Sequence, residues 1–172
     1  MKTLHLLRHA KSSWDHPELA DHDRPLAPRG ANAVQRMAAY LAGADVAPAV
    51  VLCSTALRAR DTLDGVRASL GDAVEVRMED ELYGADAREL LDRLRRLPPA
   101  LPSAMVIGHN PTLQDLALDL AGRGDREALA RLHQKFPTGA LATLLIEGEW
   151  ATLGAGTATL AALVVPRELS SG

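Results

Sequence analysis

Short apolar runs alternate with segments of helical periodicity along almost the whole chain, and this alternation is the feature that most constrains the fold. The expected strands are residues 3–7, 49–53, 74–76, 103–107, 141–146 and 160–165. Strands that alternate with helices predict an α/β domain with a mostly parallel central sheet flanked by helices. No clear helix separates the last two expected strands, which allows them to run antiparallel.

The segments between the strands carry helix signals of two kinds. Apolar residues from Val34 to Leu41 recur at i, i+3, i+4 and i+7, which is typical of one face of an amphipathic helix. Ser54 or Thr55 is placed to cap the next helix. Asp86 and, three residues later, Glu89 form the pattern of a capping box for a third helix.

Length and composition favour a single soluble domain over residues 1–172. The formal net charge is −3 and no basic run is present, so we expect no nucleic-acid partner. Cys53 is the single cysteine, which excludes an intramolecular disulfide and a cysteine-based zinc site. No stretch approaches the ~20 apolar residues of a membrane span, and the polar start gives no signal peptide. We therefore expect a cytoplasmic protein without a membrane partner.

Basic residues follow three of the expected strands at their carboxyl ends. The first strand runs into Arg8-His9, the second into the segment 54–58 that ends in Arg58, and the fourth into Gly108-His109. Ligands of open α/β sheets bind beyond the carboxyl ends of the strands. Parallel strands would bring these ends together, so the sequence predicts a pocket of two arginines and two histidines.

Such a pocket suits phosphate chemistry. The arginine fork donates paired hydrogen bonds to phosphate oxygens and stays charged. A neutral imidazole is a competent covalent nucleophile, and phosphoryl transfer otherwise demands positioning and positive charge. Arg8, Arg58 and His109 can supply that charge without a metal or another cofactor.

The three segments resemble the signature of the histidine phosphatase superfamily, the phosphoglycerate-mutase-like family. Leu6-Leu7-Arg8-His9-Ala10, residues 54–62 and Gly108-His109-Asn110 carry the likeness, and residues 23–30, 81–83 and 136–140 extend it toward the SixA-type phosphohistidine phosphatases. The resemblance implies a phosphoglycerate-mutase-like fold and a phosphatase whose nucleophile is His9. It also implies that Arg8, Arg58 and His109 hold the phosphoryl oxygens and that Arg24 is a fourth phosphate ligand.

Two further assignments remain open at this point. Glu81 occupies a place that corresponds roughly to the general acid of family members that act on alkyl phosphates, and Asp80 competes for that role. Arg24 could instead pair with Asp21 or Asp23.

The other histidines are expected to be structural. His5 lies inside the first strand and is read as a core histidine with its hydrogen bonds satisfied. His16 and His22 lie in a polar loop, where exposure to solvent is the default expectation.

The expected substrate is phosphohistidine in a protein, or a small phosphorylated molecule. One alternative is a small-molecule phosphomonoesterase or mutase of the same superfamily. Another, from a different class, is a non-catalytic phosphate-binding module, which would keep the arginines but could lose His9 or His109. A metal hydrolase would need closely spaced carboxylate or histidine ligands, and the motif segments do not supply them.

Overall fold

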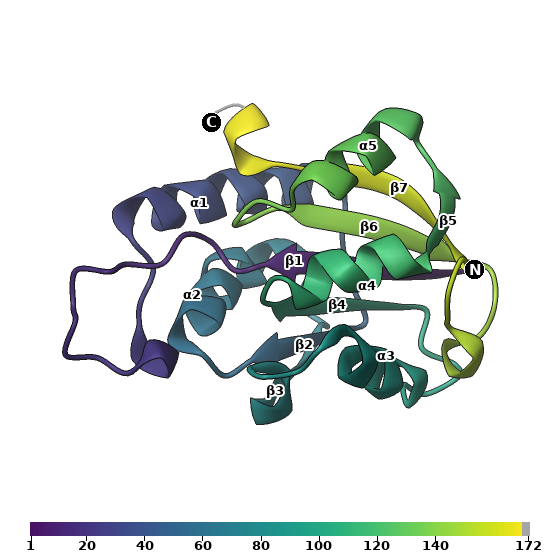
Figure 1. The fold of residues 1–172 in the computed structure, drawn as a ribbon, viewed down its shortest axis with the longest axis horizontal. Coiled ribbons are helices and arrows are strands. Elements are labelled where there is room, and N and C mark those ends of the chain that lie inside the picture. The colour runs from purple at the N-terminus through teal and green to yellow at the C-terminus, as the bar shows by residue number, and fades with distance from the viewer. Residues whose placement is uncertain (170–172) are drawn as a thin grey trace.

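A computed structural model describes residues 1–169 and shows one seven-stranded sheet (Figure 1). The strand order across the sheet is β3-β2-β4-β1-β6-β7-β5. The strands are β1 (Lys2–Arg8), β2 (Val50–Ser54), β3 (Glu75–Glu79), β4 (Ser103–Gly108), β5 (Ala121–Gly124), β6 (Leu141–Ile146) and β7 (Ala158–Val164).

The helices of the described residues cover both faces of this sheet. They are α1 (Pro28–Gly43), α2 (Leu57–Val66), α3 (Ala87–Arg95), α4 (Thr112–Leu120) and α5 (Arg126–Gln134). The short 3-10 turns are η1 (Asp21–Asp23), η2 (Arg67–Leu70), η3 (Asp80–Leu82), η4 (Trp150–Thr152) and η5 (Pro166–Glu168).

Strand pairing confirms a mostly parallel sheet with an antiparallel part. β3, β2, β4 and β1 pair in parallel, one after another. β6 runs antiparallel to both β1 and β7, which agrees with the expected antiparallel pairing of the last two strands. β5 closes the far edge in parallel with β7; its short sequence Ala-Gly-Arg-Gly is not an apolar run, and no strand is predicted there.

Two hydrophobic clusters, one on each face of the sheet, form the core. Side chains alternate between the faces of a strand, so Leu4 and Leu6 of β1 pack with α3, α4 and α5, whereas Leu7 packs with α1 and α2. Trp150 and Phe136 are the largest fully buried side chains of the first cluster. In Figure 1, α3, α4 and α5 lie on the side of the sheet that faces the viewer.

Helix capping differs in one place from the expectation. The capping box of Asp86 and Glu89 is present at α3, with the Asp86 carboxylate accepting the Glu89 N–H at 2.8 Å. α2, in contrast, begins after Ala56 without a side-chain cap. The Ser54 and Thr55 hydroxyls make other hydrogen bonds, to His109 and to Asp80, so the prediction that one of them caps α2 is wrong.

Within residues 1–169, no helix combines the length and the apolar character that a membrane crossing requires.

Candidate active site

The two histidines of the predicted pocket lie side by side because their strands are neighbours. β1 and β4 pair in parallel, with Arg8 opposite Gly108, so the residue after each strand is a histidine at the same edge of the sheet. The ring centroids of His9 and His109 are 5.1 Å apart. Arg58, in the first turn of α2, places its positive charge near both rings.

His9 is held in one orientation by the backbone. It is 7% exposed, and its Nδ1 lies 2.7 Å from the carbonyl oxygen of Ala10. A carbonyl oxygen can only accept, so Nδ1 carries the proton and the neutral ring keeps an unprotonated Nε2. Thr62 fixes the same turn, since its hydroxyl accepts the Ala10 N–H and donates to the Arg58 carbonyl.

Burial and neighbouring positive charge keep both imidazoles neutral. Desolvation, together with the nearby charges of Arg58 and Arg8, lowers the pKa of His9 to about 3. Desolvation likewise lowers the pKa of His109 to about 4, helped by Arg58. The Nε2 of His109 lies 2.8 Å from the hydroxyl of Ser54, which is fully buried. The pocket therefore contains two neutral imidazoles at neutral pH, so its positive charge comes from the arginines and not, as expected, from His109 as well.

Arg8 reaches the pocket with unused hydrogen-bonding capacity. Its Nη1 donates to the carbonyl oxygen of Phe136 at 2.9 Å. Within residues 1–169, Nη2 has no hydrogen-bond partner, and Nε is buried without one. Burial lowers the pKa of Arg8, but a guanidinium remains charged at any ordinary pH.

Arg58 binds an internal carboxylate, that of Asp21. Its Nη1 donates to the Asp21 carbonyl at 2.8 Å and its Nη2 to the Asp21 carboxylate at 2.9 Å. The Tyr83 hydroxyl donates to the same carboxylate oxygen at 2.6 Å. The hydrogen bonds from Tyr83, Arg24 and Arg58 hold the pKa of Asp21 well below its usual range.

Asp21 and Tyr83 are not predicted as site residues. Tyr83 follows η3 and also stacks edge-on against His109, with ring centroids 5.7 Å apart. The only sequence signal for Asp21 is its position three residues before Arg24.

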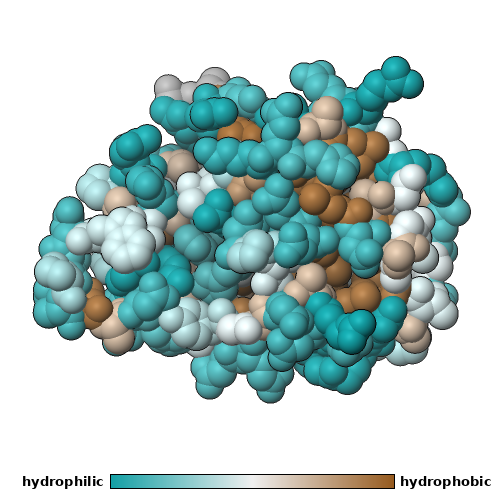
Figure 2. All heavy atoms as spheres, viewed as in Figure 1, coloured by the Kyte–Doolittle hydropathy of each residue, from teal (hydrophilic) through white to brown (hydrophobic). Residues whose placement is uncertain are grey.

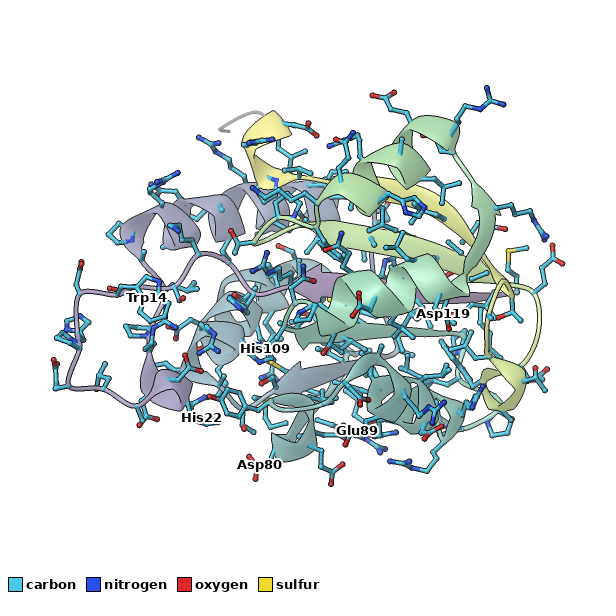
Figure 3. The ribbon with its side chains drawn as sticks, in the orientation of Figure 1. Trp14, His22, Asp80, Glu89, His109 and Asp119 are labelled. Atoms are coloured by element: carbon cyan, nitrogen blue, oxygen red, sulfur yellow. The ribbon has the colours of Figure 1, made fainter. Side chains whose placement is uncertain are left out.

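Arg24 pairs with Asp21, which is the alternative to its expected role as a phosphate ligand. Its Nη1 donates to the other Asp21 carboxylate oxygen at 2.9 Å, while Nε and Nη2 bind Ser13 and Ser12 of the same loop. Its guanidinium carbon lies 3.3 Å from the ring centroid of Trp14; Figure 3 shows Trp14 in this loop. Arg24 thus organises the loop and meets Arg58 through Asp21.

Glu81 does not join the pocket. It is exposed and lines a separate cavity of about 310 Å³ beside α3, and its charge contributes to the raised pKa of Arg93. Asp80, labelled in Figure 3, lies nearer to the site because its carboxylate accepts the Thr55 hydroxyl at 2.7 Å. Neither carboxylate makes a hydrogen bond to His9, His109, Arg8 or Arg58 among the described residues.

The other histidines divide into structural and peripheral ones. His5 is 7% exposed, with its Nδ1 3.1 Å from the Thr143 hydroxyl, which confirms it as a satisfied core histidine. His16 is exposed, as expected. His22 is not free in solvent: its Nε2 lies 3.0 Å from the Thr55 hydroxyl and its ring packs edge-on against Tyr83.

The face of the molecule around this site is polar. In Figure 2, hydrophilic residues predominate at the end of the molecule that carries the loop between β1 and α1, on the left of the view. Among residues 1–169, no group of three or more His, Cys, Asp or Glu side chains is arranged to hold a metal ion.

Fold and pocket together define a phosphoglycerate-mutase-like α/β protein. Residues 4–95 match the model of the histidine phosphatase superfamily, branch 1. The chain belongs to this superfamily. A Mycobacterium tuberculosis protein described only as uncharacterised is 39% identical over 164 residues, which are 94% of this chain and 100% of that protein. A Mycobacterium leprae protein described in the same way is 38% identical over 167 residues, with the same coverage.

Solved structures give the same assignment and a subfamily likeness. A Nakamurella multipartitia protein assigned as phosphohistidine phosphatase SixA is similar, with a TM-score of 0.78, 34% identity and 96% of each chain covered. The protein histidine phosphatase SixA complexed with tungstate has a TM-score of 0.78 and 26% identity, with 98% of this chain and 99% of that chain covered.

Proposed function

We propose that this protein is a metal-independent phosphatase that forms a phosphohistidine intermediate on His9. In the first step, Nε2 of His9 attacks the substrate phosphorus, the bond from phosphorus to the leaving group breaks, and the leaving atom takes up a proton. In the second step, water attacks phosphorus, the P–Nε2 bond breaks, and inorganic phosphate leaves.

One observation carries this proposal: the contact between Nδ1 of His9 and the Ala10 carbonyl oxygen at 2.7 Å. It fixes the proton on Nδ1 and leaves the Nε2 lone pair for phosphorus. The low pKa of His9, about 3, keeps the ring unprotonated at neutral pH. Without this orientation, a buried histidine among positive charges would be only a hydrogen-bonding residue.

The charges around His9 support the same reaction. Arg8 and Arg58 are assigned to the phosphoryl oxygens, because guanidinium groups match their geometry and charge. His109, oriented by Ser54, is assigned as a further hydrogen-bond donor to those oxygens. The similar SixA forms a complex with tungstate, a tetrahedral oxyanion like phosphate, which supports an oxyanion-binding pocket in this fold.

Among residues 1–169, neither Glu81 nor Asp80 makes a hydrogen bond to the two histidines, which favours a good leaving group. A general acid must hold a proton at the working pH, and the lowered pKa of Asp21 prevents this. Glu81 lines a different cavity, so we do not assign it to the reaction. A phosphoramidate such as phosphohistidine needs less protonation of its leaving atom than an alkyl phosphate, which supports phosphohistidine as the substrate class.

A trapping experiment tests the nucleophile. The protein is mixed with ³²P-labelled phosphohistidine protein, quenched in base, and the labelled residue is identified by peptide mapping. We expect label on His9 and no turnover in the His9→Ala variant, whereas His16→Ala, which changes an exposed histidine of the polar loop, keeps wild-type rates. Label on a different residue, or full activity of His9→Ala, refutes the assignment. Loss of activity with chelators refutes the metal-independent mechanism.

A further inference from the structure

A second cavity, of about 510 Å³, adjoins the candidate active site at Arg8. Its walls are one side of α1, the segment 135–138 and the η5 region, and α1 and η5 contact each other (Figure 1). The proposed function makes no use of this cavity beyond Arg8.

The cavity is lined by basic residues. Six of the chain's 19 lysines and arginines line it, although the net charge of the chain is −3. They are Arg8, Lys11, Arg29, Arg36, Lys135 and Arg167. No carboxylate lines the cavity among the described residues. Such a concentration of like charge stabilises a bound anion and is unfavourable without one.

The cations of this cavity are free to bind a ligand. Apart from Arg8, their side chains make no ion pair and no hydrogen bond within the part of the chain that the structure describes. The nearest carboxylate in sequence, that of Glu168, is bound by Arg131. Arg29 and Arg36 lie two turns apart on α1, and Arg167 approaches from η5.

The lining indicates the chemistry of the ligand. Arginine forks favour the planar, paired hydrogen bonding that phosphate oxygens accept, and Asn32 and Thr138 add neutral donors. The volume lies in the range of small-molecule sites. A concave site of this size fits a phosphate-bearing small molecule better than a flat protein surface.

The wall of the cavity is tied to the catalytic strand end. The Gly139 N–H, next to Thr138, donates to the carbonyl oxygens of both Arg8 and His9, at 3.1 and 3.0 Å. Arg8 itself lines the cavity and lowers the pKa of His9 through its charge. An anion in the cavity and a phosphoryl group at His9 would therefore both be close to Arg8.

We propose that this cavity is a second phosphate-binding subsite, so that the protein binds small molecules carrying at least two phosphate groups. One phosphate lies at His9 and another among Arg29, Arg36 and Arg167. The identity of the reacting phosphate rests on the proposed function, but binding in the cavity does not. If the subsite is used, it favours a small-molecule substrate with a good leaving group, such as a phosphoanhydride, over a purely protein-directed phosphatase.

Calorimetric titration with tripolyphosphate tests the subsite without any turnover. All proteins carry His9→Ala, so that the ligand stays intact. Arg29→Gln/Arg36→Gln removes two charges from the cavity, and Arg88→Gln/Arg126→Gln removes two exposed charges elsewhere. We expect the first pair to weaken tripolyphosphate binding about 10-fold or more, as expected for lost charged hydrogen bonds, and the second pair to change it less than about 2-fold. Arg167→Gln, on a different element, is expected to weaken binding in the same direction.

Three outcomes overturn the proposal. Equal loss in both double variants shows a general charge effect. Unchanged tripolyphosphate binding in the cavity variants shows that the subsite does not take phosphate. If the same cavity substitutions, made in protein that keeps His9, raise only the KM for a phosphohistidine protein and leave tripolyphosphate binding unchanged, the cavity is a protein-docking surface. Because turnover is absent from the titration, a failed nucleophile assignment at His9 leaves its result intact.

Discussion

One oxygen of the Asp21 carboxylate accepts a hydrogen bond from Nη2 of Arg58 at 2.9 Å, and the other accepts one from Nη1 of Arg24 at 2.9 Å. An internal anion thus neutralises an arginine that a phosphate group would use. Tyr83 donates to the same carboxylate, so the contact links the loop before α1 to the turn after β3.

We predict that Asp21→Asn tightens oxyanion binding. The change removes the negative charge that competes with phosphate for Arg58, and we expect the Kd for tungstate or inorganic phosphate to fall about 3- to 10-fold, or up to about 1.4 kcal/mol. Asp21 is about half exposed, so we expect little loss of stability from this change. Isothermal titration measures the Kd. Weaker binding in the variant would show instead that Asp21 positions Arg58 for the substrate.

Arg58→Ala is predicted to act mainly on the transition state. The change removes a charged donor next to both histidines, and the loss of one such donor typically costs roughly 10²- to 10³-fold in kcat. Steady-state rates on a phosphohistidine mimic measure the effect, and thermal denaturation checks the fold. Arg60→Ala, an exposed residue of the same helix, serves as the control. Equal losses in both variants would contradict a specific role of Arg58.

Stability is predicted to fall as the pH drops from about 6.5 to about 4. Burial lowers the pKa of His5, His9 and His109 to about 4, about 3 and about 4, whereas unfolded histidines titrate near 6.5. Between these values the unfolded chain binds protons that the folded chain does not, so the free energy of unfolding decreases by up to about 1.4 kcal/mol per pH unit for each histidine.

Urea denaturation at several pH values measures this slope. His5→Asn keeps a polar partner for Thr143 and removes one titrating group outside the pocket. The variant should show a shallower slope, by up to one proton. An unchanged slope would show that His5 does not contribute to the pH dependence.

Two glycines of α1 are predicted to respond oppositely to alanine. A Cβ on Gly30 would lie 2.1 Å from the Lys11 carbonyl oxygen, whereas a Cβ on Gly43 meets nothing within 4 Å. Gly30→Ala must displace the loop after His9, and we expect a loss of about 1–3 kcal/mol. Gly43→Ala should be neutral or stabilising by less than about 1 kcal/mol. Chemical denaturation compares the two, and similar effects would contradict the close approach at Lys11.

The sequence by itself determined the architecture and the central pair of histidines. Apolar periodicity is a local signal, and it located six of the strands and the first of the helices and allowed the last two strands to run antiparallel. The positions of Arg8-His9 and Gly108-His109 after two strands determined that the histidines would meet once those strands were parallel neighbours.

Only the tertiary structure decided the partners of the polar side chains. Asp21 meets Arg58 and Tyr83 across 37 and 62 residues of sequence, and no local pattern encodes such a contact between loops. Glu81 comes after the predicted strand, but the turn η3 places it at the cavity beside α3 rather than at the histidines. The basic cavity draws its residues from four separate stretches of the chain, none of them a charge run. Backbone periodicity is read from neighbouring residues, whereas the charge around a site depends on how distant segments pack.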